Sequence, residues 1–302
     1  MLIACVQTDV KIGNVDHNTD RVLDWLSKAA AEGAQLVVFP ECMLTGYCFE
    51  SRQEALEHAV EVDAQPIRAI AKASKQLGLT VTLGSLVQSS LITVQTDGAP
   101  VTSQQGLDEI RLTNSALLFD QGHMIARYDK VHLPNLGVDR FVDRGREPYQ
   151  SQRTSLPESC RVGLAICYDC SFPEPMRALA LDGTDVIALG TNWPAEAVRT
   201  AAIVPPARSM ENHLYFVAAN RVGHERGFDF CGNSSICGPD GIELAHSHDD
   251  KETLLLGEAD PNKARLKRIE RTVGRHSIDR FADRQPEFYG IVSDPAVKEQ
   301  TQ

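Results

Sequence analysis

The chain has 302 residues, and its 30 basic side chains against 41 acidic ones give a formal net charge of −11. This acidic balance disfavours nucleic acid as a partner, because phosphate binding requires clustered lysine and arginine side chains. Hydrophobic residues make up 42% of the chain, which is enough for a sizeable core and argues against disorder.

Compartment can be inferred from the absence of targeting patterns. No apolar run approaches the roughly 20 residues needed to cross a bilayer, so we expect no membrane association. The N-terminus has no basic segment followed by an apolar stretch, the pattern of a secretory signal. The eight cysteines are too sparse for a disulfide scaffold in a chain of this length. These features predict a cytoplasmic protein.

Apolar runs of strand length alternate with helical patterns in the first half of the chain. We expect strands over residues 2–10, 36–39, 79–87, 112–119 and 124–131, and helices over 18–32 and 66–77. The polar stretch 88–109 is interpreted as an extended hairpin or loop, and 134–159 as a long loop of the kind that often carries function.

The second half repeats this style. We expect strands over residues 161–167, 186–189, 215–219, 234–237, 242–245 and 253–258, and helices over 174–181, 195–213 and 262–271. The second of these helices should break at Pro205-Pro206. We find no linker, so a single α/β domain is expected over residues 1–260. Residues 261–302 should form a C-terminal helix and tail associated with oligomer formation.

Three of the expected strands end on reactive side chains. Glu41 follows the strand at 36–39, Lys130 ends the strand at 124–131, and Cys167 ends the strand at 161–167. Ligand sites in α/β folds favour the carboxyl ends of strands. Taken singly, each residue has a simpler structural explanation, so the functional argument depends on the sequence around all three.

Five sequence blocks follow one another along the chain: Phe39-Pro40-Glu41 with Gly46-Tyr47, residues 128–135, residues 166–169 with 172–174, residues 191–194, and Arg208 with Glu211-Asn212. Together they resemble the nitrilase superfamily of carbon–nitrogen hydrolases, and Tyr168-Asp169 after the cysteine resembles its amidase and carbamoylase branches. The resemblance runs from Leu2 to about Asp260. It implies a four-layer α-β-β-α sandwich, a Glu41–Lys130–Cys167 catalytic triad and no metal or other cofactor.

The chemistry of this triad is intelligible from its side chains. A thiol has a resting pKa near 8.5, so Cys167 needs a base to take its proton during attack on an amide. Glu41 suits that role if partial burial raises its pKa. Lys130 can stabilise the oxyanion, helped by the backbone N–H of Tyr168. The family mechanism adds protonation of the leaving amine and hydrolysis of a thioester on Cys167.

One departure from the family concerns a second glutamate expected in the loop after the lysine. Residues 137–145 contain no glutamate, and Val138 or Asp139 falls near the expected position. Asp139 is therefore a possible accessory group, whereas Glu147 comes too late in the loop.

Three other functional classes compete with hydrolysis. Cys167-Tyr168-Asp169-Cys170 is formally a C-x-x-C redox motif, but a thioredoxin-like unit needs neither Glu41 nor Lys130. The ligand-rich turn 246–250 lacks a second ligand pair with matching spacing, which disfavours a metal site. A non-catalytic binding protein would be indicated by loss of a triad member, and all three members are present.

The residues after Cys167 bear on the substrate. Nitrile-cleaving members follow the cysteine with Trp-Glu, whereas this chain has Tyr168-Asp169. We expect hydrolysis of a small amide to acid and ammonia; an N-carbamoyl amine or amino-acid hydrolase is the alternative. The expected pocket walls are Tyr47, Arg140, Phe141, Asn192 and Trp193. An arginine of the loop could bind a substrate carboxylate. The family also implies a homodimer or larger homo-oligomer, formed through the helices expected at 174–181 and 195–213.

Overall fold

The computed structural model describes residues 1–90, 93–94, 100–101 and 110–294. The chain forms two compact units, residues 1–265 and residues 266–302. The polar stretch expected as a hairpin at 88–109 lies largely outside the described residues. Within it, β4 (Thr93–Val94) pairs antiparallel with β5 (Pro100–Val101).

The first sheet of residues 1–265 contains six strands around a parallel centre. Its strands are, in order, β16 (Thr253–Glu258), β1 (Leu2–Gln7), β2 (Leu36–Val38), β3 (Thr80–Ser90), β6 (Ile110–Asp120) and β7 (His123–Asp129). β1, β2 and β3 are parallel, and the other three strands add antiparallel at the two edges. The second half of the chain thus supplies one edge strand, β16, to the sheet of the first half.

The second sheet repeats this plan. Its strands are, in order, β15 (Glu243–His246), β14 (Ser235–Cys237), β11 (Tyr215–Asn220), β10 (Val186–Thr191), β9 (Arg161–Ile166) and β8 (Ser151–Arg153). β9, β10 and β11 are parallel and the flanking strands are antiparallel. Because β8 lies within residues 134–159, the segment expected as a long loop contains a short edge strand.

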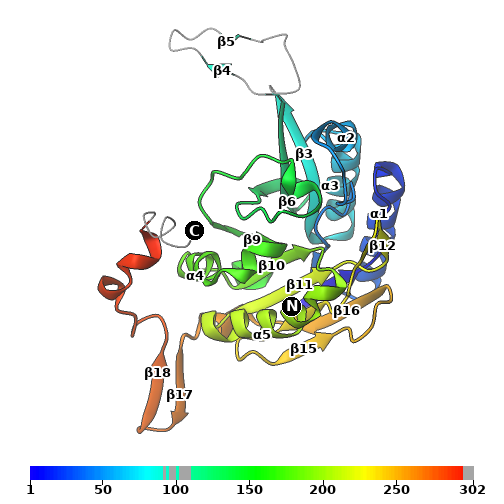
Figure 1. The fold of residues 1–302 in the computed structure, drawn as a ribbon. Coiled ribbons are helices and arrows are strands. Elements are labelled where there is room, and N and C mark those ends of the chain that lie inside the picture. The colour runs from blue at the N-terminus through cyan, green and yellow to red at the C-terminus, as the bar shows by residue number, and fades with distance from the viewer. Residues whose placement is uncertain (91–92, 95–99, 102–109, 295–302) are drawn as a thin grey trace. The chain divides into compact units, whose positions relative to one another are not determined.

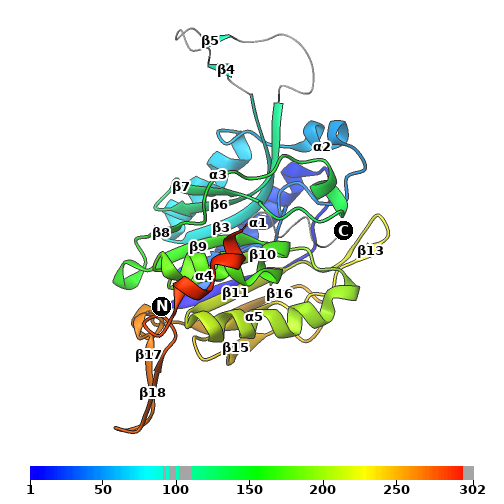
Figure 2. The same ribbon diagram turned by 60° about the vertical axis from the view of Figure 1, so that its left-hand side comes forward.

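The two sheets pack face to face and helices cover their outer faces (Figures 1 and 2). β1 faces β11, and β2 faces β10 and β11. α1 (Val15–Ala31) and α3 (Gln65–Leu77) pack on the first sheet, and α5 (Val198–Asn212) packs on β11 and β14 beside α4 (Pro173–Leu181). The expected four-layer α-β-β-α sandwich is confirmed.

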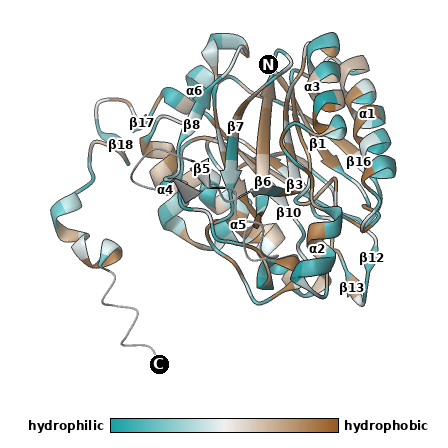
Figure 3. Cartoon of the chain, turned by 90° about the horizontal axis from the view of Figure 1, so that it is seen from above, coloured by the Kyte–Doolittle hydropathy of each residue, from teal (hydrophilic) through white to brown (hydrophobic). Residues whose placement is uncertain are grey.

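The apolar pattern of the sequence explains this layering. The α1 side chains Val22, Trp25, Leu26 and Ala29 recur at helical spacing and are buried against the first sheet. The central strands carry nearly continuous apolar runs because both of their faces are covered. Figure 3 shows the middle of the sandwich largely brown, whereas the peripheral helices carry more teal.

Two expectations about the helices are wrong: the break at Pro205-Pro206 and the length of the last helix. Pro205 and Pro206 lie inside α5, which continues unbroken to Asn212. A proline ring fixes φ near its helical value, so the helix can continue where tertiary packing offsets the missing N–H donors. The helix expected at 262–271 ends as α6 (Pro261–Arg265). β17 (Arg268–Thr272) then pairs with β18 (His276–Asp279), and Gly274 supplies a positive φ of 66° at the turn.

One helix was not expected from the sequence. α2 (Arg52–His58) has only seven residues, too few for a clear hydrophobic period. Ser51 caps it by accepting a hydrogen bond from the Glu54 backbone N–H. This helix follows the Glu41 segment and packs near β3.

Candidate active site

The three reactive residues expected at strand ends lie at the carboxyl ends of their strands. Glu41 comes three residues after β2, whereas Lys130 follows β7 directly and Cys167 follows β9 directly. All three are buried between the two sheets, and Lys130 is fully inaccessible. Glu41 and Lys130 both act electrostatically on the Cys167 thiol. The structure therefore brings the expected triad together.

Two glycines allow the Glu41 backbone to pass between the sheets. A Cβ atom at Gly84 on β3 would lie 2.7 Å from the Cα atom of Glu41. A Cβ atom at Gly190 on β10 would lie 2.9 Å from the Glu41 nitrogen. Both distances are below ordinary contact, so only glycine permits this approach from each sheet. The next residue, Cys42, has a strained φ of 50°.

Cys167 occupies a sharp turn between a strand and a helix. Its φ of 42° is unfavourable for a residue with a side chain, and it begins the 3₁₀ turn Cys167–Ser171 that leads into α4. The Asp169 carboxylate holds this turn by accepting a 2.9 Å hydrogen bond from the Ile166 N–H. Arg208 of α5 donates to the carbonyls of Cys170 (2.9 Å) and Ser171 (3.1 Å). These contacts maintain the strained backbone of the thiol residue.

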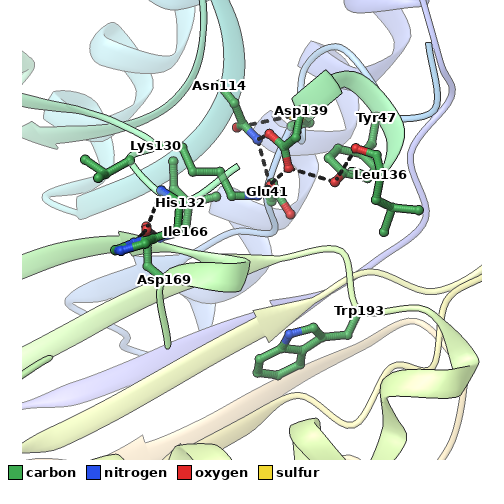
Figure 4. A network of polar contacts seen from close by, with 12 residues as sticks. Glu41, Tyr47, Asn114, Lys130, His132, Leu136, Asp139, Ile166, Asp169 and Trp193 are labelled. Atoms are coloured by element: carbon green, nitrogen blue, oxygen red, sulfur yellow. Dashed lines mark hydrogen bonds and ion pairs between the residues drawn. The ribbon is translucent and has the colours of Figure 1, made fainter. Parts of the chain in front are cut away.

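Lys130 bridges two buried carboxylates (Figure 4). Its Nζ atom lies 2.7 Å from Glu41 Oε1 and 2.5 Å from Asp139 Oδ2. The Asn114 amide nitrogen donates to the same pair, at 2.7 Å to Glu41 Oε1 and 3.0 Å to Asp139 Oδ1. Tyr47 adds a 2.8 Å hydrogen bond from its hydroxyl to Asp139 Oδ2. Of the two candidates Val138 and Asp139, it is therefore Asp139 that contacts Lys130.

This cluster sets the protonation of its members. Burial raises the pKa of Glu41; Lys130 opposes that shift and Asp139 adds to it. Burial alone would lower the pKa of Lys130, but the attraction of Asp139 and Glu41 outweighs it and raises that pKa well above its usual value. Lys130 is thus held as a cation, and the raised pKa makes the Glu41 carboxylate a stronger base than an exposed one.

The Cys167 thiol is protonated at rest. Burial, followed by the neighbouring Glu41 carboxylate, raises its pKa to about 12. Lys130, the Thr191 side chain and the Asn192 backbone act in the opposite direction without overcoming that shift. A nucleophilic reaction of Cys167 therefore requires transfer of its proton to a base during attack.

A second polar network links the lysine segment to the thiol turn. The buried Asp169 carboxylate accepts hydrogen bonds from the hydroxyls of Tyr128 (2.8 Å) and Tyr149 (3.1 Å). His132 Nδ1 lies 2.8 Å from Asp169, and the His132 ring stacks on Phe172 at 4.1 Å. These contacts fix the His132 side chain between the lysine segment and the thiol turn. Asp169 and Tyr149 were not identified as site residues from the sequence.

The residues expected to line the pocket occupy different environments. Asn192 is buried, and neither atom of its side-chain amide has a hydrogen-bond partner among the residues that the structure describes. Trp193 is buried, and its backbone N–H donates to Asn220 Oδ1 at 2.8 Å. Tyr47 lies against the lysine cluster, with its ring centre 5.9 Å from Lys130 Nζ.

The remaining residues of the expected site lie farther towards the surface. Arg140 is exposed, lies over the Phe141 ring at 4.8 Å and donates to the carbonyls of Gly137 (3.0 Å) and Phe49 (3.4 Å). Tyr168 follows Cys167 in the 3₁₀ turn, and its ring is partly exposed. The first N–H groups of such a turn have no partner inside it, so the Tyr168 N–H suits the oxyanion role.

The competing features of the sequence gain no support from the geometry. All eight cysteines are free thiols, including Cys167 and Cys170. Within residues 1–90, 93–94, 100–101 and 110–294, no three His, Cys, Asp or Glu side chains form a group that could hold a metal ion. His246, from the ligand-rich turn, instead pairs with Glu243 at 3.2 Å. In the described part of the chain, no helix is both long enough and apolar enough to span a bilayer.

A buried thiol beside a carboxylate–ammonium pair, on a four-layer α-β-β-α sandwich, defines a cysteine-dependent hydrolase class. The family model "Carbon-nitrogen hydrolase" matches residues 2–269. A nitrilase of Pyrococcus abyssi is 32% identical over 289 residues, covering 95% of this chain and 98% of that protein. The chain belongs to the carbon–nitrogen hydrolase family, and the resemblance drawn from its sequence blocks is confirmed.

Relatives named as amidases also match. An (R)-stereoselective amidase of a Pseudomonas species is 30% identical, covering 83% of this chain and 82% of that protein. A 2-oxoglutaramate amidase of Bacillus subtilis is 25% identical, covering 95% and 98%. Among solved structures, a nitrilase-superfamily amidase of Nesterenkonia sp. AN1 superposes with a TM-score of 0.75 at 23% identity, over 97% of both chains. That likeness supports the shared fold.

Proposed function

We propose that this carbon–nitrogen hydrolase converts a small linear amide and water into a carboxylic acid and ammonia through a thioester on Cys167. The observation that carries this proposal is the buried Cys167 thiol at a strand end beside the buried Glu41–Lys130 ion pair. Relatives named as amidases support the same reaction class.

Acylation begins when the Cys167 sulfur attacks the amide carbon and its proton moves to Glu41. The developing oxyanion is stabilised by the Lys130 ammonium and the Tyr168 backbone N–H. As the carbon–nitrogen bond breaks, Glu41 gives its proton to the nitrogen and ammonia leaves. Glu41 then takes a proton from water as the water oxygen attacks the thioester carbon. The carbon–sulfur bond breaks, the carboxylic acid leaves, and the proton returns from Glu41 to the Cys167 sulfur.

Asp139 takes the place of the family's second glutamate in this proposal. Its contacts with Lys130 and Tyr47 hold the ammonium in position beside Glu41. The side chain is one methylene shorter than glutamate. The 3₁₀ turn Gly137–Arg140 compensates by bringing the Asp139 backbone close to Tyr47, whose carbonyl accepts from the Val138 N–H at 2.8 Å.

The substrate is expected to be short. Tyr47, Trp193 and Phe141 would form apolar walls, and the unpartnered Asn192 amide could hydrogen-bond a polar group of the substrate. Arg140 would have to leave the Gly137 and Phe49 carbonyls to bind a substrate carboxylate. An N-carbamoyl amine or amino acid would present the same carbonyl and leaving nitrogen, and remains the alternative substrate class.

An ammonia-release screen tests the reaction and the substrate class. The panel contains aliphatic amides, ω-amides of dicarboxylic acids, N-carbamoyl compounds and nitriles. We expect short amides to be hydrolysed fastest. If substrates with a distal carboxylate are preferred and Arg140→Ala loses this preference, Arg140 binds the substrate carboxylate. Faster turnover of carbamoyl compounds would select the alternative, and faster turnover of nitriles than amides would contradict the proposal.

We also infer a homodimer or larger homo-oligomer in a reducing, cytoplasmic compartment. The eight free thiols support the inferred reducing compartment.

The inferred oligomer is supported by exposed apolar side chains on α5 and in or beside β15: Ile203, Met210, Ile242 and Leu244. Light scattering at micromolar concentration should give at least twice the chain mass of 33.1 kDa, and Ile203→Asp should reduce it. A monomeric mass for the unmodified chain would contradict the inference.

A further inference from the structure

Asn114 contacts three groups of the site from the middle of β6. The residue is fully buried, in an antiparallel strand that crosses the first sheet. Its side-chain nitrogen donates to both Glu41 Oε1 and Asp139 Oδ1. Its backbone carbonyl accepts a 2.8 Å hydrogen bond from the Lys130 N–H. One residue therefore contacts the base and the second carboxylate through its side chain and the backbone of Lys130 through its carbonyl.

The orientation of the Asn114 amide follows from its neighbours. The two carboxylate oxygens are acceptors only, so the NH₂ group must face them. The amide oxygen, on the other side, accepts a hydrogen bond from the Cys42 thiol at 3.4 Å. An apolar side chain in this position would leave each carboxylate with one donor fewer inside the protein.

The two oxygens of Glu41 are consequently unequal. Oε1 accepts hydrogen bonds from Lys130 Nζ and Asn114 Nδ2, each at 2.7 Å. Oε2 is buried and has no hydrogen-bond partner among the residues that the structure describes. A buried carboxylate oxygen without a partner is costly, so such an atom calls for a functional explanation.

We propose that Asn114 is a positioning residue. Its hydrogen bond to Glu41 Oε1 orients the carboxylate so that Oε2 is the oxygen that transfers the proton. In this step the S–H bond of Cys167 breaks and an O–H bond forms on Oε2. On departure of ammonia the O–H bond breaks and an N–H bond forms. The inference deepens the proposed function, since it rests on Glu41 as the base.

The charged and titratable groups around Glu41 allow the effect of Asn114 to be recognised. Lys130, Asp139, Cys167, Cys42 and Tyr47 all interact electrostatically with Glu41. Asn114 is neutral, but its hydrogen bond favours the ionised carboxylate and lowers the pKa of Glu41. Loss of this donor must therefore raise the pKa of Glu41. As the pH falls, activity that needs ionised Glu41 is then lost at a higher pH than in the unmodified protein.

The test measures alkylation of Cys167 by iodoacetamide as a function of pH, with the modified cysteine identified by peptide mass spectrometry. For Asn114→Ala we expect the rate constant to fall about tenfold or more. The acid limb should move to higher pH, because the lost hydrogen bond favours the ionised Glu41 carboxylate. Thr113→Val is the matched control, because this buried neighbour on β6 bonds to Val87 and Arg127 instead.

A shape-preserving variant keeps the test decisive if Asn114→Ala fails to fold. Asn114→Asp is isosteric but replaces the donor by an acceptor, so it should shift the acid limb at least as far. Slower alkylation with an unmoved acid limb in the folded variants would show a merely structural role and overturn the inference. Failure of the proposed function would look different: the unmodified chain would then release no ammonia in the substrate screen, whatever its alkylation profile.

Discussion

Cys167→Ala should abolish ammonia release from every amide that the unmodified protein hydrolyses. The variant removes the sulfur that forms the thioester, and no other group in the proposed reaction can carry the acyl chain. The fold should survive because the substitution removes only one sulfur atom. Circular dichroism and thermal unfolding can check this expectation. With a slow substrate, intact-protein mass spectrometry should detect an acyl adduct on the unmodified protein and none on the variant.

Cys170→Ala provides the matched control for this experiment. Cys170 lies in the same 3₁₀ turn and is fully buried, so the packing change is comparable. Its variant should keep turnover within a few-fold of the unmodified protein. Loss of activity in Cys170→Ala alone would reverse the assignment of the nucleophile, and loss in both variants under reducing conditions would indicate a role for the pair.

Glu41→Gln should lower the rate of acylation by on the order of a hundredfold or more, as removal of a general base usually does. Glutamine keeps an oxygen that can accept from Lys130 and Asn114, so the cluster should retain its shape while losing its proton acceptor. Lys130→Met should cause a similar loss by removing the oxyanion donor. Single-turnover kinetics on the best amide of the screen would measure both effects.

The pH profile gives the same prediction a second readout. Glu41 must be ionised to take the thiol proton, and burial raises its pKa. The acid limb of kcat/KM should therefore lie above the range of an exposed carboxylate and should disappear in Glu41→Gln. Glu57→Gln, at an exposed position of α2, is the control and should leave the profile unchanged. Near-normal turnover in Glu41→Gln would remove Glu41 from the mechanism.

Much of the fold could be predicted because its signals are local. The alternation of short apolar runs with amphipathic segments reflects strands covered on both faces and helices covered on one. The reactive residues could be placed for a similar reason, since Glu41, Lys130 and Cys167 each follow a recognisable strand. The family resemblance then joined three separate sequence positions into one expected site.

Where local signals misled, tertiary packing was stronger than intrinsic preference. Two consecutive prolines should end a helix, yet α5 continues through Pro205 and Pro206 against β11 and β14. Residues 268–271 belong to the segment expected as a helix, but they form most of β17, which pairs with β18 across a turn at Gly274. Pairing with the neighbouring strand of a hairpin cannot be read from a helical period.

The sequence by itself determined the layered α/β architecture, the positions of Glu41, Lys130 and Cys167 after three strands, and the absence of a glutamate from residues 137–145. Only the tertiary structure decided that Asp139 reaches Lys130 and that Asn114 connects both carboxylates. It also decided that Gly84 and Gly190 admit Glu41 from opposite sheets. These relations join residues far apart in the chain, and their energies depend on distances of a few ångströms that no local pattern encodes.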